Sequence, residues 1–477
     1  MRRRKTKIIA TLGPASSERE VIAAMVDAGM DVARLNFSHG DYDVHRQLAA
    51  RVREESERAG RAVALLQDIQ GPKIRLGKMA GGGLELEPGS KVRVLQGAEE
   101  APGGALSIDY PHLLEDLGPG QEILLVDGLV RLVVEERTQE ALVARVLEGG
   151  PVQNHQGAAF PKATLRTKAV TEKDRRDLEF GRELGVDFVA ASFVRSEADI
   201  QEVRKYAAPD TPIIAKIELA AAYENLRSIL ATAHGAMVAR GDLGVEMALE
   251  RLPNVQNQIL LQTNGSGDVS ITATEMLESM IHSRRPTRAE VTDVSSAVLA
   301  GSDAVMLSGE TAVGEHPVRV IEMMDRICLE VERGPRHQAM DPVDFLQQEA
   351  PVPSATTRAA VAAAQSLDLD TIIAFTESGS TARLLSKYRP GARIIAFTPE
   401  TRTFRRMALY WGVEPRLFDR FDSTDEMLQM AERRVVEEGL CQAGETVVMV
   451  AGIPPNQRSS TNFMKLHAIG DSVLEAS

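Results

Sequence analysis

Short apolar runs alternate with helical stretches through the first two thirds of the chain, and this alternation restricts the possible folds most strongly. Each run is almost continuously apolar, as expected for a parallel strand that is buried on both faces. The runs are Lys7–Thr11, Asp31–Phe37, Ala62–Ile69, Phe188–Val194, Pro212–Glu218, Ala236–Asp242, Val269–Glu275 and Ala304–Glu310. Eight such units predict an α/β fold, a closed (β/α)8 barrel of the TIM type, with functional residues at the carboxyl ends of its strands.

Helix start signals follow several of these runs. Ser17–Glu20 and Thr287–Glu290 fit the capping box, in which a hydroxyl residue and a carboxylate three positions later bond each other's backbone N–H groups. Thr171–Asp174 is a looser version of the same pattern. We therefore expect helices to begin at these three places.

The composition changes between the third and fourth predicted strands. Glycine and proline clusters, such as Gly81–Gly83, separate short alternating runs such as Lys91–Leu95. The triple glycine has no helix behind it, so we do not interpret it as a phosphate-binding loop. We predict that residues 71–161 form a small all-β lid domain inserted into the barrel, which comprises residues 1–70 and 162–335.

A third domain is predicted for residues 350–477. It contains the apolar runs Thr371–Phe375, Arg393–Phe397 and Thr446–Val450, with helical stretches between them, which predicts an α/β domain. Between the first run and its helix lies Thr376–Thr381, a cluster of small hydroxyl residues. Their hydroxyls, the backbone N–H groups and the helix dipole together suit a phosphate, whereas an ordinary helix cap needs only one such residue.

Polar and charged residues stand at the ends of several predicted barrel strands. Residues two apart on a strand share a face, so Lys216 and Glu218 should project together. The set includes Arg34, Asn36, Ser38, Asp68, Lys216, Glu218, Arg240, Asp242, Thr272, Thr274 and Glu275. Such ends converge on one mouth of a barrel, where carboxylates suit Mg²⁺ and fixed cations suit phosphoryl transfer. Each motif alone is typical of a surface ion pair or a loop; their coincidence on successive strands favours a functional site.

At these residues the sequence resembles pyruvate kinase, almost from end to end. The resembling stretches are Thr11–Ser16, Ala33–Gly40, Gln70–Arg75, Ile214–Glu218, Met237–Glu246, Ile271–Ile281, Arg285–Glu290 and Met306–Thr311. The resemblance implies phosphoryl transfer from phosphoenolpyruvate to ADP, giving pyruvate and ATP in the last step of glycolysis. It implies Mg²⁺ or Mn²⁺ as the cofactor, a cytoplasmic homotetramer, and a regulatory role for the third domain.

The resemblance also implies roles for individual residues. Lys216 would stabilise the transferring phosphoryl group, Arg34 would contact the phosphate, and Thr274 would help to protonate the enolate. Glu218 and Asp242 would hold Mg²⁺. The residues implied to bind substrate are Arg34, Lys216, Gly241, Asp242 and Thr274. The implied nucleotide-binding residues are Asn36, His39 and Arg75. The implied effector-binding residues, for a phosphorylated allosteric ligand, are Thr376, Ser378, Gly379, Ser380 and Thr381.

The sequence departs from the family pattern at the monovalent-cation site. Asn36, Ser38 and Asp68 match the family's potassium ligands, but Ile69 has no hydroxyl to offer. Lys73 places an ammonium where potassium-dependent members carry a carboxylate, and this charge can do the electrostatic work of the cation. We therefore predict a vestigial site and activity that does not require K⁺. The alternative is that Lys73 is a solvated loop lysine.

Further departures fall near the expected nucleotide. Gln156 stands where the family has a lysine in the segment that returns from the lid, and Lys162 lies close enough in sequence to compensate. Leu219–Ala222 replace a polar segment, and Glu275 stands where glutamine is usual. These changes predict an altered arrangement for ADP. Two alternative functions therefore stay open. One is a catalytically weakened sensor that binds phosphoenolpyruvate, and the other is a barrel lyase or aldolase that uses a metal-bound pyruvate enolate.

Charge and cysteine content restrict the partners. The net charge is −13, which disfavours nucleic acid and anionic membrane surfaces. Cys328 and Cys441 lie far apart, so we expect no disulfide framework and a reducing, cytoplasmic environment. No apolar run approaches the roughly 20 residues that span a bilayer.

Overall fold

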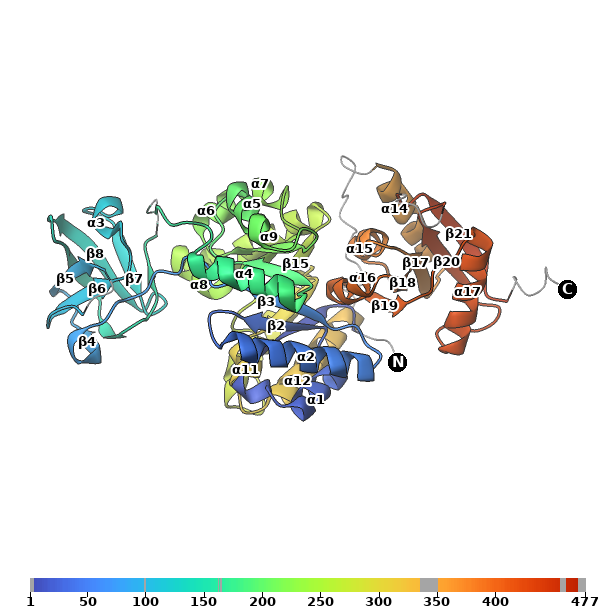
Figure 1. The fold of residues 1–477 in the computed structure, drawn as a ribbon, viewed down its shortest axis with the longest axis horizontal. Coiled ribbons are helices and arrows are strands. Elements are labelled where there is room, and N and C mark those ends of the chain that lie inside the picture. Colours follow the sequence, from blue (N-terminus) through green and yellow to red (C-terminus); the bar gives the residue numbers. More distant parts are fainter. Residues whose placement is uncertain are drawn as a thin grey trace.

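The computed structural model describes residues 4–97, 100–161, 163, 165–334, 351–454 and 460–470. Lys162 and most of the segment that precedes the third domain therefore lie outside the described residues. Three parts follow one another along the long axis of the molecule: a β-rich part, a central barrel, and a C-terminal α/β part (Figure 1). Within the described ranges, no helix combines the length and the apolar character needed to cross a membrane.

The central part is a closed parallel barrel, which confirms the predicted fold class. Its strands, in the described residues, are β1 (Lys7–Leu12), β2 (Val32–Asn36), β3 (Ala64–Asp68), β12 (Phe188–Ala191), β13 (Ile213–Ile217), β14 (Gly235–Ala239), β15 (Val269–Ala273) and β16 (Ala304–Leu307). They pair in the order β1-β16-β15-β14-β13-β12-β3-β2, with β2 closing on β1. Buried side chains such as Ile9, Leu66 and Met306 fill the interior.

The barrel strands end earlier than the apolar runs suggested. Arg240–Asp242, expected to end a strand, instead begin the short helix α8 (Arg240–Glu246). Thr274 and Glu275 leave β15 with φ angles of +69° and +52°, a conformation that cannot continue a strand ladder. After β16, the chain enters α11 (Gly309–Ala312). Polar residues expected at strand ends therefore stand on turns just beyond them.

Two of the three expected capping boxes are present. Thr171 accepts from the backbone N–H of Asp174 at the start of α4 (Glu172–Leu184), and Thr287 accepts from that of Glu290 at the start of α10 (Arg288–Leu299). The prediction at Ser17 is wrong. Helix α1 (Arg19–Ala28) has no side-chain cap, because the Ser17 hydroxyl donates to Pro14 O in the preceding 3₁₀ turn. The other barrel helices are α2 (Tyr42–Arg58), α5 (Glu197–Tyr206), α6 (Ala220–Glu224), α7 (Leu226–Leu230), α9 (Leu252–Gly265) and α12 (Pro317–Arg333).

The part inserted between β3 and β12 consists mainly of strands. They are β4 (Gly83–Leu86), β5 (Lys91–Gln96), β6 (Ala105–Ile108), β7 (Glu122–Leu125), β8 (Val130–Arg137), β9 (Ala141–Glu148), β10 (Gly150–Gln153) and β11 (Ala158–Ala159), with one short helix, α3 (Leu113–Asp116). They form a β10-β4 pair and a sheet in the order β11-β7-β8-β9-β5-β6. An isolated β-bridge between Arg75 and Gly157 joins the segments that enter and leave this lid.

The C-terminal part is a five-stranded sheet, in the described residues, with helices packed on it. The strand order is β19-β18-β17-β20-β21, with only β21 antiparallel. The three predicted strands are confirmed as β17 (Thr371–Phe375), β18 (Arg393–Thr398) and β20 (Thr446–Ala451); β19 (Val413–Leu417) and β21 (Phe463–Ala468) were not predicted. The helices are α14 (Pro351–Ser366), α15 (Ser380–Lys387), α16 (Thr401–Arg406) and α17 (Thr424–Glu437).

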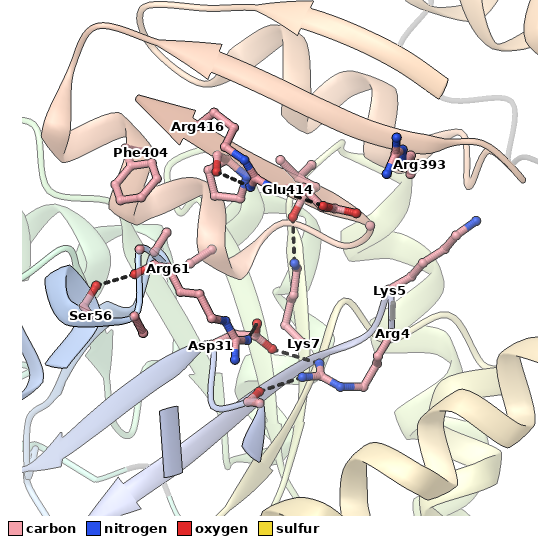
Figure 2. Close-up of a pocket in the computed structure, with 18 of the residues that line it drawn as sticks. Arg4, Lys5, Lys7, Asp31, Ser56, Arg61, Arg393, Phe404, Glu414 and Arg416 are labelled. Atoms are coloured by element: carbon pink, nitrogen blue, oxygen red, sulfur yellow. Dashed lines mark hydrogen bonds and ion pairs between the residues drawn. The ribbon is translucent and has the colours of Figure 1, made fainter. Parts of the chain in front are cut away.

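The C-terminal part contacts the amino-terminal ends of the barrel strands. A cleft of about 1440 Å³ lies there, and the close-up shows Lys7 at the start of β1 reaching across it (Figure 2). Lys7 Nζ donates to Val413 O at 2.8 Å. Deeper in the junction, Lys387 and Arg389 both contact the Asp303 carboxylate just before β16. The carboxyl ends of the strands, where the sequence places the candidate site, are at the opposite end of the barrel.

Candidate active site

Two buried cations and two buried carboxylates form a continuous chain at the carboxyl ends of β2, β3 and β13. Arg34 Nε donates to Asp68 Oδ2 at 2.7 Å, and Arg34 Nη1 donates to Thr11 Oγ1 at 2.9 Å. Lys216 Nζ lies 3.2 Å from Asp68 Oδ1 and 2.9 Å from Glu218 Oε1. The side chains of Asp68 and Glu218 are each 1% exposed. The expected convergence of strand-end residues is thus present for this group.

Burial and pairing act in opposite directions on these charges. Burial alone would raise the pKa of Asp68, but Lys216 and Arg34 outweigh it and hold the pKa below its usual range. Burial alone would lower the pKa of Lys216, but Asp68 and Glu218 outweigh it and raise the pKa. Lys216 therefore stays protonated at neutral pH and offers a fixed positive charge in a site of low dielectric.

Glu218 and Asp242 fit a divalent cation. Burial raises the pKa of Glu218, Lys216 opposes this, and the nearby charge of Asp242 raises it further. A cation bound by both carboxylates would offset the cost of burying the Glu218 charge and would also offset its repulsion by Asp242. Among the described residues, no group of three or more His, Cys, Asp or Glu side chains could hold a metal. Two protein carboxylates suit Mg²⁺, which keeps several waters or substrate oxygens as ligands.

Thr274 is held in a strained conformation beside this group. A β-branched residue at φ +69° is disfavoured by about 1–3 kcal/mol, so its surroundings must fix it. Gly241 N donates to Thr274 Oγ1 at 3.0 Å, and Oγ1 donates to Ala273 O at 2.6 Å. Arg240 Nε lies 3.1 Å and 3.2 Å from the carbonyl oxygens of Ala273 and Thr274, and its Nη1 pairs with Asp293 at 2.7 Å.

Ser192 was not predicted as a site residue, although it contacts Lys216. Lys216 Nζ donates to Ser192 Oγ at 2.7 Å, and Ser192 Oγ donates to Ile69 O at 2.7 Å. Ser192 follows β12, whose apolar run gave no reason to single out a serine. Phe193 was missed as well: its backbone N–H donates to Glu218 Oε2 at 2.6 Å. A polar residue one position beyond a barrel strand is the signal that could have identified Ser192.

The structure separates the residues expected to bind nucleotide. Arg75 lies on the lid side, where its Nη1 donates to His155 O at 3.0 Å. His39 is exposed, and its carbonyl is 3.0 Å from His45 Nε2. Asn36 is paired in register with Asp68 across β2 and β3, and Asn36 Oδ1 accepts from Ser38 N at 3.1 Å. Asn36, Ser38 and Asp68, the expected monovalent-cation ligands, therefore lie close together, whereas Arg75 contacts the segment that returns from the lid.

Lys73 reaches the expected metal site from the outgoing lid connection. Its Nζ donates to Asp242 Oδ1 at 3.0 Å, and the two side chains are 29% and 33% exposed. They line a cleft of about 400 Å³ between lid and barrel, together with Gly157, Phe160 and Glu218. Burial raises the pKa of Glu246, on the same cleft, to about 6. Lys73 is therefore paired with Asp242 and partly exposed.

The hydroxyl cluster of the third domain forms a turn before α15. Thr376 Oγ1 accepts from Gly379 N at 2.9 Å, and Gly379 has φ +86°, which favours glycine. Ser378 Oγ lies 3.1 Å from Ser380 Oγ, both near the surface. Thr381, in contrast, is buried and bonds Thr461 at 2.8 Å between their hydroxyls. The turn thus presents Ser378 and Ser380 outward, while Thr376 and Thr381 hold it in place.

Comparisons with known proteins place the chain in a family. Residues 3–321 match the family model "Pyruvate kinase, barrel domain", and residues 354–467 match "Pyruvate kinase, alpha/beta domain". The chain is 42% identical over 475 residues to a pyruvate kinase of Geobacillus stearothermophilus, covering 98% of this chain and 81% of the relative. It is 42% identical over 478 residues to one of Mycobacterium tuberculosis, covering 98% and 99%. A relative from Staphylococcus saprophyticus is 40% identical over 478 residues, covering 99% and 82%. From these matches and the site that they accompany, the chain belongs to the pyruvate kinase family of phosphotransferases.

Proposed function

We propose that this pyruvate kinase transfers the phosphoryl group from phosphoenolpyruvate to ADP with Mg²⁺ or Mn²⁺ held by Glu218 and Asp242, and without K⁺. The observation that carries the proposal is the buried chain Arg34–Asp68–Lys216–Glu218, which keeps two cations charged at the mouth of a barrel. Phosphoryl transfer depends mainly on positioning and on neutralising the charge of the phosphoryl oxygens, and fixed buried cations supply both.

The side chains would divide the work as follows. Arg34 is fixed by Asp68 and Thr11, while its Nη2 has no hydrogen-bond partner among the described residues and would bind the phosphate. Lys216 would exchange its contact with Glu218 for an oxygen of the transferring group. When bound, the metal supplies a Lewis-acid charge that neutralises oxygens of the substrate. Thr274 Oγ1, held by Gly241 N, would hold the proton, directly or through water, that the enolate of pyruvate needs.

Lys73 supports independence from K⁺. Its ammonium pairs with Asp242 at 3.0 Å and lies 5.9 Å from the centre of the Phe193 ring, so a positive charge is already in place beside the metal carboxylates. The vestigial ligands Asn36, Ser38 and Asp68 would then need no monovalent cation, since Arg34 and Lys216 already neutralise Asp68.

The test is ADP-dependent pyruvate formation from phosphoenolpyruvate and Mg²⁺ in sodium buffer. We expect robust turnover that changes little on adding K⁺, that stops with EDTA, and that collapses in Lys216→Met. Lys205→Met is the matched control, because Lys205 is an exposed lysine that pairs only with Glu202 among the described residues. A severalfold rise with K⁺ would overturn the role of Lys73. Binding of phosphoenolpyruvate without any turnover would favour a sensor.

We also propose that the turn at 376–381 binds a phosphorylated effector. The outward hydroxyls of Ser378 and Ser380 and the start of α15 support this. Titration with sugar phosphates and nucleoside monophosphates should give binding that Ser378→Asp removes by charge repulsion. Unchanged binding in that variant would contradict the assignment. A cytoplasmic homotetramer is the family expectation, and sedimentation of the purified chain would test the assembly.

A further inference from the structure

The loop that follows β12, Ser192–Arg195, contacts both the charged site residues and the connections to the lid. We call it the bridging loop. Phe193 has φ +54°, an uncommon conformation for an aromatic residue, so contacts on both sides must hold the loop. It lies between the catalytic charges on the barrel and the two chain segments that connect the barrel to the lid.

The first half of the bridging loop fixes the catalytic charges. Ser192 Oγ accepts from Lys216 Nζ at 2.7 Å, and Phe193 N donates to Glu218 Oε2 at 2.6 Å. These contacts set the positions of the lysine and of a proposed metal carboxylate. A shift of the loop would therefore move both groups together.

The same half packs against the connection that leaves the barrel for the lid. Gly71 has φ +67°, and a Cβ built there would lie 2.9 Å from Ser192 O and 3.2 Å from Phe193 Cδ2. Gly71 is needed for both reasons, because no other side chain would fit against the loop. The outgoing connection is therefore in direct contact with the residues that hold Lys216 and Glu218.

Arg195, at the other end of the bridging loop, donates hydrogen bonds to the connection that returns from the lid. Its Nη1 donates to Leu165 O at 3.0 Å and to Thr167 Oγ1 at 3.1 Å, and its Nη2 donates to Thr167 O at 2.8 Å. A planar guanidinium can donate to several oxygens of one segment at once, which a lysine ammonium cannot do with the same geometry. All three residues line the cleft between lid and barrel.

Asp199, in the first turn of α5, orients this guanidinium. Asp199 Oδ2 accepts from the backbone N–H of Arg195 at 2.8 Å and of Ser196 at 3.2 Å, and both carboxylate oxygens lie 3.4 Å from the guanidinium. The side chains of Arg195 and Asp199 are 28% and 12% exposed. The arginine is therefore anchored to the rigid barrel at its base and to the lid connection at its tip.

We propose that Arg195 is a positioning residue that sets the lid over the nucleotide cleft, in fixed relation to Lys216 and Glu218. The proposal rests on the proposed transfer to ADP, because the lid forms one wall of the cleft where ADP would bind. Without the guanidinium, the returning connection loses its attachment to the bridging loop. The nucleotide wall is then held less firmly, while the barrel groups that would bind and enolise pyruvate keep their contacts.

The experiment separates these two sets of groups. Steady-state kinetics give kcat and the KM for ADP. Exchange of the C3 protons of pyruvate in D₂O, with Mg²⁺ and inorganic phosphate, reports the barrel groups without a nucleotide. The variants are Arg195→Met, Arg195→Lys and Asp199→Asn. The matched control is Arg175→Met, which removes an arginine of α4 that is 42% exposed and pairs with Glu172 at the surface.

Arg195→Met should raise the KM for ADP about tenfold to a hundredfold, the equivalent of one charged hydrogen bond, and leave proton exchange within about twofold. Arg195→Lys and Asp199→Asn should change KM in the same direction by about threefold to tenfold, and they decide the matter if Arg195→Met does not fold. Arg175→Met should resemble the wild type. An unchanged KM, or proton exchange that falls in step with turnover, would overturn the proposal. A wild type that exchanges protons but never uses ADP would instead refute the proposed function.

Discussion

Asp303 lies at the junction between the barrel and the C-terminal part, and its replacement by asparagine should destabilise the protein strongly. Lys387 and Arg389 contact its carboxylate, and Ser270 N donates to Oδ2 at 2.8 Å. The side chains of Asp303 and Lys387 are each 1% exposed. Asp303→Asn keeps the shape of the side chain but leaves two buried cations without their counter-ion.

The magnitude follows from the burial. Removing one partner of a buried ion pair costs about 3–5 kcal/mol, because the remaining charge is uncompensated. Burial lowers the pKa of Lys387 to about 8, so without Asp303 the lysine would release its proton near neutral pH, which limits the cost. We expect Asp303→Asn to lower the free energy of unfolding by about 3 kcal/mol. Adding Lys387→Met should recover part of this loss, because it removes one orphaned cation.

Urea unfolding at pH 7 can be followed through Trp411, the only tryptophan of the chain. The Arg389 guanidinium lies 4.7 Å and the Lys5 ammonium 5.1 Å from the centre of its ring, so its fluorescence reports this junction. Glu135→Gln, at a partly exposed ion-paired site on the lid, is the control and should change the unfolding midpoint little. A cost below about 1 kcal/mol for Asp303→Asn, or a double variant that costs the sum of the single ones, would refute a strong buried ion pair at this junction.

Three further outcomes are expected. Glu246→Gln should stabilise the protein at pH 8 by up to about 2 kcal/mol and have little effect at pH 4. The reason is that a carboxyl whose folded pKa is raised to about 6 contributes stability below its unfolded pKa, and this contribution is lost as the pH rises through 6. Thermal unfolding at both pH values checks this. Thr287→Ala should lower the free energy of unfolding by about 1 kcal/mol in urea, because α10 loses its cap; Thr292→Ala, within the helix, is the control. Gly71→Ala should lower kcat at least about tenfold, because a Cβ would displace Ser192; equal activity in stopped assays would contradict this contact.

The strand interiors of the barrel could be predicted because burial on both faces demands a continuous apolar run. Their ends could not, since the positive φ of Thr274 and the helical turn at Arg240 depend on contacts with other strands. Strand β19 was missed because Pro415 and charged neighbours hide its apolar character. The capping box predicted at Ser17 is not formed, because a 3₁₀ turn precedes the helix and its Pro14 carbonyl accepts from the Ser17 hydroxyl.

The convergence of the charged site residues was predictable for a topological reason. Asp68, Lys216 and Glu218 lie at, next to or just beyond the ends of their strands, and Arg34 lies two residues before the end of β2. A closed barrel brings such positions together regardless of side-chain detail. Ser192 and Arg195 depend on the path of a loop, which the period of a strand does not determine. The sequence does contain one signal that could have identified Arg195. This residue directly precedes a helix start signal, whose first and last positions are Ser196 and Asp199.

The β-bridge between Arg75 and Gly157 bears on how the chain reaches its fold. Strands β3 and β12 pair side by side, yet the whole lid is synthesised between them. An unfolded excursion of that length would add closure entropy to the barrel, whereas a folded insertion with touching ends behaves as a short tether. The lid can thus fold as a separate unit before the later strands of the barrel have been synthesised. An insertion at such a place burdens folding so little that it could be gained or exchanged as a module.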